Sequence, residues 1–274
     1  EGWEVENDGR SWTFTLREGL RFHDGEPVRA ADCVASIRRW GARDQFGQEA
    51  MAATDELVAL DDRRFRFRLK RPFPLLATAI GKQTSSPCFI MPERVAATDP
   101  NRQITETVGS GPYRFLRDEF VPGARVAYQR FDGYRPRQEA PDWTAGGRVG
   151  HMERVEWSII PDPATAGAAI QTGEVDFLEF PLHDLLPVFR RNRDLVVRIR
   201  DRMGTYAMLR FNHLVPPFNN PALRRALAMA VNQEDYMRAI VGSDDALWKA
   251  CPGFFTPGTP LYSEAGGDIL KGPR

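Results

Sequence analysis

The sequence lacks several features that would assign it to a large class of proteins. Lysine plus arginine number 37, and so do aspartate plus glutamate, which leaves no net charge to attract nucleic acid or an anionic membrane. No apolar run of about 18 residues or more occurs, so we expect no membrane span. The first residues carry neither the basic nor the apolar stretch of a signal peptide, in a chain that does not begin with methionine.

Cysteine and histidine are scarce. The three cysteines, Cys33, Cys88 and Cys251, form no CxxC pair, and no histidine stands at metal-ligand spacing from them. This excludes an extensive disulfide framework and argues against a zinc site, so we expect no metal and no cofactor. Cys33 falls within a predicted helix, where a small apolar core residue is the simplest interpretation.

Familiar catalytic motifs are also missing. The chain contains no GxGxxG, GxxxxGK[ST], GxSxG or HExxH sequence. Asp24 lies between His23 and Gly25, where an aspartate more often caps a turn than acts as an acid or base. We therefore predict that the protein is not an enzyme. A hydrolase of α/β type, whose serine, histidine and aspartate meet only in space, stays open as a distant alternative.

Enough apolar residues are present to bury a core, since 42% of the chain is hydrophobic and 11% aromatic. The first half alternates apolar and polar residues with the period of strands. A helix with Val34 and Ile37 on one face is predicted to end at Gly41. The predicted elements are two strands at 11–22, a helix at 30–40, a hairpin at 55–70, a short helix up to Gly81, a polar loop at 82–89 and a hairpin at 112–130.

The pattern changes after an irregular segment rich in glycine and proline at 132–150, which we interpret as a possible domain boundary. From there predicted strands alternate with predicted helices, a succession typical of α/β construction. The predicted strands are 155–159, 175–180, 195–199 and 205–212, and the predicted helices are 163–172, 182–191 and 221–240.

Five motifs occur in an order that resembles the peptide/nickel family of extracytoplasmic solute-binding proteins. Any one of them is weak, but together they cover nearly the whole chain. Two departures are modest: Cys33 replaces a usual aliphatic residue, and Ser110 a common threonine. The motifs are WTFTLREGLRFHDG at 12–25, PVRAADCV at 27–34, GSGPYRF at 109–115, AAIQTGEVD at 168–176 and NHLVPPFNNPALRRAL at 212–227.

The resemblance implies an α/β fold of the periplasmic-binding-protein type II kind, with two lobes and an extra α+β subdomain. Family members are longer, with a strand region before the first motif and more of the second lobe after the last, so we expect an incomplete fold here. The implied division is an extra subdomain with hairpins at 1–142, part of the first lobe at 143–204 and the beginning of the second lobe at 205–274.

The resemblance further implies the substrate-binding component of an ABC importer. Such a protein would bind peptides or similar small solutes by lobe closure and deliver them to a membrane permease. A nickel chelate, an opine or an oligosaccharide are alternative cargoes. We expect a monomer in the periplasm, or one anchored by lipid outside the cytoplasmic membrane, with its three cysteines buried or one pair bridged. The isolated chain should bind poorly, because part of the cleft would be absent.

Ligand contacts in this family lie partly on two segments near the hinge, which correspond here to 177–180 and 206–212. Glu179 is a candidate partner for a ligand amine, and Arg210 for a carboxylate. The alternation that puts Met208 and Arg210 on one face is equally compatible with a face in solvent. Trp3 and Trp40 are predicted to be core residues. The candidate ligand-binding residues are Phe177, Glu179, Phe180, Met208, Arg210 and Asn212, with Phe46, the loop residues Thr84 and Ser86, and Tyr113 as weaker candidates.

Overall fold

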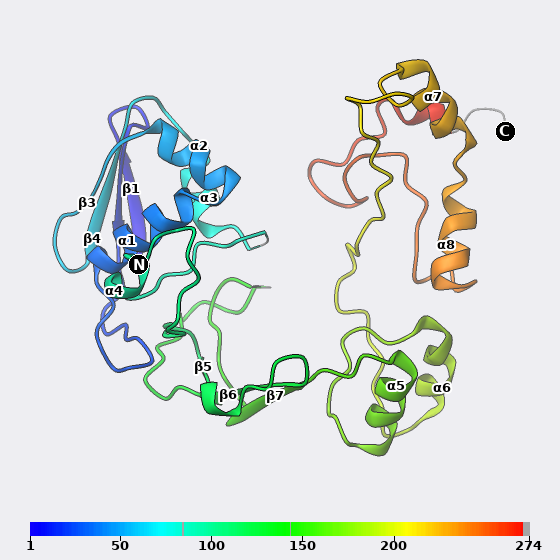
Figure 1. Ribbon diagram of the computed structural model, residues 1–274, viewed down its shortest axis with the longest axis horizontal. Coiled ribbons are helices and arrows are strands. Elements are labelled where there is room, and N and C mark those ends of the chain that lie inside the picture. The colour runs from blue at the N-terminus through cyan, green and yellow to red at the C-terminus, as the bar shows by residue number, and fades with distance from the viewer. Residues whose placement is uncertain (84, 143, 271–274) are drawn as a thin grey trace. The chain divides into compact units, whose positions relative to one another are not determined.

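A computed structural model describes residues 1–83, 85–142 and 144–270, and the chain divides into two compact units (Figure 1). The first unit spans Glu1–Ile159 and the second Ile160–Arg274. The finer division of the chain at residues 142 and 204 stays a prediction.

The first unit is built on a four-stranded antiparallel sheet, here called the first sheet, with strand order β1-β2-β4-β3. Aromatic residues face each other across its centre, where Trp12 pairs with Phe67 and Phe14 with Phe65. The predicted hairpin and the first predicted strand are confirmed. The second strand predicted before residue 22 is wrong, because Arg21 makes only an isolated bridge with Pro27. The strands are β1 (Gly2–Glu6), β2 (Ser11–Thr15), β3 (Thr54–Ala59) and β4 (Arg64–Leu69).

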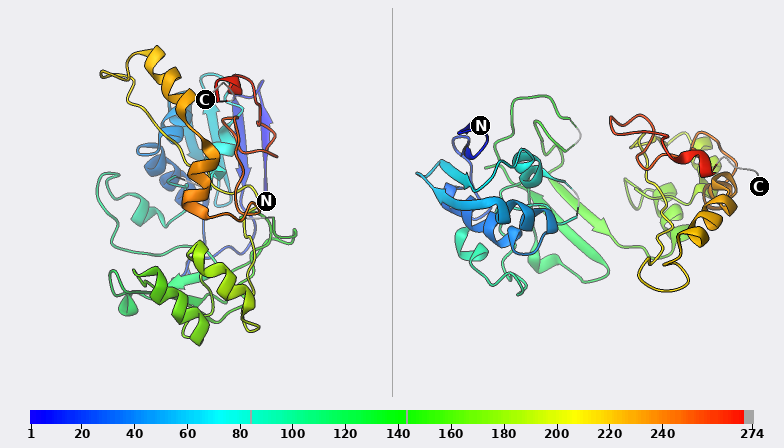
Figure 2. Two further views of the ribbon diagram at one scale, coloured as in Figure 1. Left: turned by 90° about the vertical axis from the view of Figure 1, so that its right-hand side faces the viewer. Right: turned by 90° about the horizontal axis from the view of Figure 1, so that it is seen from above.

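Helices cover one face of the first sheet (Figures 1 and 2), and aromatic side chains of β2 and β4 lie in the core on that face. The helices place Ile37 of α1 and Leu76 of α3 in one buried cluster with Phe67. The predicted helix at 30–40 is confirmed, but Gly41 is its last residue and Ala42 the cap, so Gly41 is not the stop signal. The short helix ending at Gly81 is confirmed. The helices are α1 (Ala30–Gly41), α2 (Gln45–Ala53), α3 (Leu76–Gly81) and α4 (Glu93–Ala96).

A second sheet completes the first unit, with three antiparallel strands in the order β5-β6-β7. Its strands are β5 (Tyr113–Phe115), β6 (Arg125–Arg130) and β7 (Arg154–Ser158), and a short 3₁₀ turn, η1 (Arg117–Glu119), follows β5. The hairpin predicted at 112–130 is therefore confirmed. The strand predicted at 155–159 is also confirmed, but it pairs with β6 and so belongs to the antiparallel part of the chain.

The second unit contains helices joined by extended segments. The helix predicted at 163–172 is confirmed as α5, which begins where Asp162 accepts a hydrogen bond from Thr165 N and ends at Gly173 with φ 76°. The helix predicted at 221–240 is broken, because Asn232 leaves helical geometry and caps a new helix. The helices are α5 (Pro163–Thr172), α6 (Leu186–Arg191) preceded by η2 (His183–Leu185), α7 (Pro221–Ala230), α8 (Gln233–Val241) and η3 (Gly267–Leu270).

The strands predicted at 175–180, 195–199 and 205–212 are wrong for the described structure, where these segments run without ladder partners. An alternating sequence becomes a strand only when another strand supplies backbone hydrogen bonds beside it. The described part of the second unit offers no such neighbour. Apolar side chains on these segments consequently remain in solvent, and they include Phe177, Phe180, Val196, Ile199, Met208 and Leu209.

Burial is confirmed for two of the three residues predicted to lie in the core, Cys33 and Trp40, and is wrong for Trp3. Trp40 and Cys33 are buried on α1 as expected. Trp3 is 57% exposed, because β1 is an edge strand and the helices pack mainly on β3 and β4 at the other side of the first sheet. Cys88 and Cys251 are half-buried, and all three thiols are free. Burial raises the pKa of the Cys33 and Cys88 thiols to about 12 and so keeps them in their unreactive form.

Candidate functional site

His23 joins two of the matched motifs within the first unit. Its backbone N–H donates to Gly109 O at 2.8 Å, and Gly109 N–H donates back to His23 Nδ1 at 3.3 Å. The other ring nitrogen, Nε2, lies 3.0 Å from Gly111 O. Desolvation of the half-buried ring lowers the pKa of His23. The imidazole is therefore a neutral structural group that holds the glycine-rich motif.

Asp24 caps its turn, as the sequence predicts. One carboxylate oxygen accepts from Glu26 N–H at 3.1 Å, and the other lies 2.8 Å from the Arg94 guanidinium. Although partial desolvation opposes it, the hydrogen bond from Arg94 lowers the pKa of Asp24. Arg94 also pairs with Glu106 at 2.9 Å. Arg94 thus neutralises both carboxylates. We interpret this cluster as a structural joint between the turn and α4, and not as an acid–base pair.

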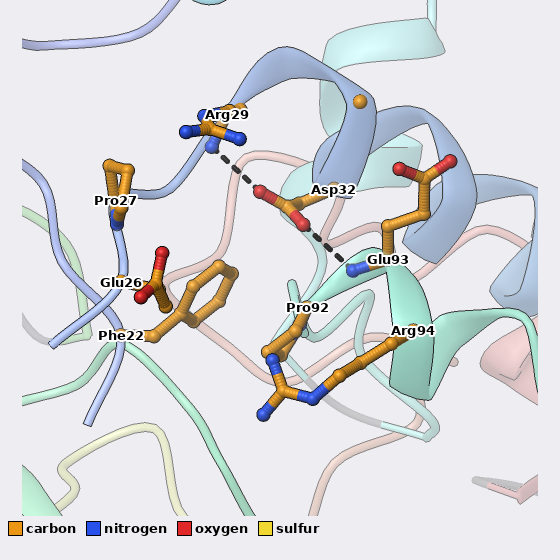
Figure 3. Close-up of a pocket in the computed structure, with 9 residues that line it drawn as sticks. Phe22, Glu26, Pro27, Arg29, Asp32, Pro92, Glu93 and Arg94 are labelled. Carbon is orange, nitrogen blue, oxygen red and sulfur yellow. Dashed lines mark hydrogen bonds between the residues drawn. The ribbon is translucent and has the colours of Figure 1, made fainter. Parts of the chain in front are cut away.

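A polar hollow lies beside this joint at the start of α1 and α4 (Figure 3). Asp32 lies in its wall, where the carboxylate accepts hydrogen bonds from Arg29 N–H at 2.8 Å and from Glu93 N–H at 2.7 Å (Figure 3). The two helix starts are thereby tied together. The hollow has charges of both signs around it and no converging set of free polar groups. Its walls are Phe22, Glu26, Pro27, Arg29, Ala31, Asp32, Pro92, Glu93 and Arg94.

Two buried side chains, Asp44 and Trp40, hold described residues of the predicted polar loop. Lys82 pairs with Asp44 at 2.5 Å and also donates to Ser85 O, while Trp40 Nε1 donates to Ser86 O at 2.7 Å. Ser85 and Ser86 both adopt left-handed geometry, with φ 52° and 62°. The Ser86 side chain is exposed, whereas its carbonyl is engaged. The candidate at position 84 lies outside the described residues.

Phe46 and Tyr113, the other candidates in the first unit, both have packing roles. Phe46 is half-buried and meets Phe73 edge-on, with ring centroids 6.0 Å apart. The Tyr113 hydroxyl donates to Met152 O at 2.8 Å, and its ring lies so close to Gly150 that a Cβ there would be 3.1 Å away. Tyr113 thus fastens β5 to the segment that leads into β7.

Glu179 in the second unit already has a partner, since its carboxylate pairs with the Arg200 guanidinium. The sequence offered no signal for this pairing, because the two residues lie on segments without regular structure. Phe180, beside Glu179, is 78% exposed, and Phe177 is exposed as well. This segment therefore presents aromatic rings and one weakly held carboxylate to solvent.

The segment 206–212 presents a free cation. Arg210 is exposed, and it has no ion pair among the described residues. Met208 is exposed beside it, while Asn212 uses its Oδ1 to accept Leu214 N–H at 3.0 Å in a turn. Within the described part of the chain, no hydrogen bond or ion pair links this segment with 177–180. The structure thus leaves these two groups of candidates as separate exposed segments.

Neither a metal cluster nor a membrane helix is found in the described ranges. Nowhere in them do three or more His, Cys, Asp or Glu side chains come together in a way that could hold a metal ion. Similarly, no described helix combines the length and apolar character needed to cross a membrane.

Comparison with known proteins decides the family. Residues 1–271 match the family described as bacterial extracellular solute-binding proteins, family 5 Middle. The chain belongs to this family. The resemblance read from the five motifs is therefore confirmed.

The curated relatives of this chain include a probable peptide ABC transporter periplasmic-binding protein, y4tO, of Sinorhizobium fredii. It is 41% identical over 262 residues, which are 95% of this chain and 47% of the relative. The chain thus spans about half the length of this curated relative. Relatives of this kind are named as transport-associated binding proteins.

Solved structures with a similar fold identify the fold class of this chain. The binding protein MoaA of A. tumefaciens R10, in complex with mannopinic acid, gives a TM-score of 0.71 at 24% identity, over 94% of this chain and 49% of that one. DppA of Helicobacter pylori, in complex with the peptide STSA, gives a TM-score of 0.67 at 24% identity, over 88% of this chain and 48% of that one. The predicted fold class is confirmed: the chain has a partial two-lobe fold of the type II periplasmic binding proteins.

Proposed function

We propose that this chain is part of the substrate-binding component of an ABC importer, which binds peptides or similar small solutes and delivers them to a membrane permease. The observation that carries this proposal is its membership of family 5 over nearly its full length, together with the 41% identity to a probable peptide-binding relative. The same family supports a binding role without catalysis and a location outside the cytoplasmic membrane, in the periplasm or lipid-anchored. A monomer suffices for this role.

The mechanism follows from a two-lobe fold. A solute that contacts both lobes only when they are closed binds the closed form more tightly and shifts the population toward it. The permease then recognises the closed form. The shift can be no larger than the difference in affinity between the two forms, so side chains that touch the solute on each lobe set its size.

Arg210 is the strongest candidate for a ligand carboxylate or acidic side chain. Its guanidinium is exposed and has no competing anion among the described residues, and a guanidinium can bind a carboxylate through two parallel hydrogen bonds. Met208 beside it offers a flexible apolar contact that suits side chains of different shapes. Asn212 would contribute its amide nitrogen, because its oxygen is engaged in the turn.

Glu179 is the candidate for a ligand amine, and its present partner does not prevent this. The pair with Arg200 is exposed, and exposed pairs contribute only about 0–1 kcal/mol. A ligand ammonium group could therefore replace Arg200 at small cost. Phe177 and Phe180 would supply apolar walls. Phe46, Ser86 and Tyr113 remain weaker proposals, since packing and backbone contacts account for each of them.

Another cargo within the same class is the alternative. The solved relative that holds mannopinic acid shows that this fold accommodates an opine as well as a peptide. A nickel chelate or an oligosaccharide belongs to the same alternative. Each of these solutes carries different charges, so the cargo can be distinguished by which ions and side chains its binding requires.

Calorimetric titration of the gene product that carries this chain, against dipeptides, tripeptides, an opine and a nickel–histidine complex, tests the proposal. We expect a peptide to bind, and Arg210→Ala to weaken that binding by about 10- to 100-fold through loss of a charged hydrogen bond. Arg225→Ala removes another exposed guanidinium, on α7, and should leave affinity unchanged. Binding of the opine or nickel complex alone would favour the alternative cargo, and binding of none would contradict the proposed function.

A further inference from the structure

One imidazole connects the two sheets of the first unit. His23 belongs to the turn at 21–27, which leads directly into α1 on the first sheet. The segment it holds, 109–111, leads directly into β5 of the second sheet. Three hydrogen bonds cross this junction, and both ring nitrogens take part in them.

The backbone groups around the ring fix its protonation state. Gly109 presents an N–H to Nδ1, so Nδ1 must accept and cannot carry a proton. Gly111 presents a carbonyl oxygen to Nε2, so Nε2 must donate. Only the neutral ring with its proton on Nε2 satisfies both contacts. A second proton would set Nδ1–H directly against Gly109 N–H.

The surroundings of the ring also disfavour a second proton. The ring is half-buried, and Phe131, which follows β6, lies edge-on with its centroid 5.1 Å away. Burial is the main reason that the pKa of His23 is lowered, and the positive charge of Arg114 on β5 adds to it. Asp24 and the Gly111 carbonyl act in the opposite direction. The influence of Asp24 is limited, because Arg94 of α4 neutralises its carboxylate.

We propose that His23 is an acid-sensitive latch, which holds the segment 109–111 and the sheet that follows it while the ring is neutral, and releases them when the ring is protonated. A histidine whose pKa is lower in the folded state contributes stability that is fully present above its unfolded pKa. This contribution is lost as the pH falls from the unfolded pKa towards the folded one. Protonation should therefore open the junction locally.

A second contact between the two sheets, made by Arg17, explains why protonation of His23 should open only the 109–111 junction. Arg17 donates from its guanidinium to Arg135 O at 2.9 Å and to Pro136 O at 3.1 Å, on the segment that follows the second sheet's central strand. A guanidinium keeps its charge throughout the range in which histidine titrates. Acid therefore removes the latch and leaves this contact in place. The latch concerns the first unit alone and does not depend on the proposed cargo.

Nuclear magnetic resonance of the ring nitrogens in the 274-residue chain tests the latch directly. We expect His23 to show the Nε2–H tautomer at neutral pH and to take up its second proton at lower pH in the folded chain than in the same chain unfolded in urea. A proton on Nδ1, or the same titration of His23 in the folded and the unfolded chain, would overturn the proposal, and neither measurement requires a variant. His151, which is exposed, provides a control position for substitution.

Hydrogen exchange of the Gly109 amide tests release. Between the folded and unfolded pKa of His23, its opening constant should rise by up to about tenfold for each unit of decrease in pH. The Gly25 amide, which donates to Phe22 O at 2.9 Å in the same turn, should show no such rise. His23→Phe keeps an aromatic ring but should give fast exchange at Gly109 at every pH, whereas His151→Phe should behave as wild type. Parallel exchange of Gly109 and Gly25 across this range would contradict the latch.

Discussion

The first and second units contain similar amphipathic patterns but differ in what those patterns bury. In the first unit the apolar faces of α1 and the first sheet meet, and Phe67 is completely buried between them. In the second unit α7 and α8 are also amphipathic, yet neither buries a single residue. Leu214, between the extended segments and α7, is 90% exposed. An amphipathic pattern therefore creates a core only where a second apolar surface faces it.

Stability should follow this difference. Buried apolar surface is the main favourable contribution to folding, and it has to exceed the conformational entropy lost by every ordered residue. The first unit meets this requirement with a continuous cluster that includes Trp12, Ile37 and Leu57. Among the described residues of the second unit, the buried large apolar side chains are Leu186 and Phe189 of α6, and Phe189 lies against Gly167 of α5. We expect the two units of the chain to unfold separately.

Hydrogen exchange of the 274-residue chain should show the largest effect. Amides of β4 are expected to open only with the whole first unit, at a cost on the order of 5 kcal/mol or more. Amides of 176–180 and 205–212 lack ladder partners and should exchange almost as fast as in an unfolded peptide. Equal protection of β4 and these two segments would show that the second unit is as stably folded as the first.

The same contrast explains which parts of the fold were predictable. The hairpin of β3 and β4 and the helix α5 depend on signals within a few residues, such as the cap at Asp162 and the left-handed Gly173. The predicted strands of the second unit depend on neighbours that no local pattern identifies. The burial predicted for Trp3 failed for a similar reason. An apolar side chain does not reveal whether a helix covers the strand that carries it.

The candidate site was less predictable than the fold. Sequence patterns indicated which segments carry aromatic and charged residues, and the structure leaves Phe180 and Arg210 exposed there. The pair of Glu179 with Arg200 could not be predicted, since it joins two irregular segments across the chain. The role of His23 was missed as well, because a histidine in a turn shows its partners only when Gly109 and Gly111 are placed beside it.

Removal of one aromatic ring from each unit should give the next largest effect. Phe67→Ala creates a cavity in the first unit and should lower its free energy of unfolding by about 3–5 kcal/mol. Phe180→Ala removes a ring that is 78% exposed and should change stability by less than about 0.5 kcal/mol. Urea titration followed by tryptophan fluorescence measures both. A loss at Phe180 comparable to that at Phe67 would mean that the second unit has a core of its own.

The ion pair between the buried Asp44 and the half-buried Lys82 should give a smaller effect within the first unit. Lys82→Met leaves the carboxylate without its charged partner and should cost about 2 kcal/mol at neutral pH. Lys70→Met, which removes an exposed ammonium group 3.5 Å from Ala52 O, serves as the matched control and should be nearly neutral.

The pH dependence of the same pair provides a second measurement. Despite the opposing effect of desolvation, the hydrogen bond from Lys82 lowers the pKa of Asp44. A carboxylate with a lowered folded pKa contributes stability above its unfolded pKa and loses it as the pH falls towards the folded value. In wild type this contribution should therefore decline under acid conditions, whereas in Lys82→Met the decline should be smaller. An identical acid dependence in both proteins would show that the pair does not stabilise the fold.

The smallest expected effect lies in the best-defined helix of the second unit. Gly173 ends α5 at φ 76°, and a Cβ added there would meet no atom within 4 Å, so Gly173→Ala should cost only backbone strain of about 1 kcal/mol. Opening constants of α5 amides, measured by hydrogen exchange, should then rise about fivefold. Gly81→Ala is the matched change at the last residue of α3, where φ is not positive and the added Cβ also meets nothing, and it should be neutral or slightly stabilising. If Gly173→Ala left α5 unchanged, the helix would depend on packing and not on its local end signal, and the second unit would resemble the first more closely than its exposed surface indicates.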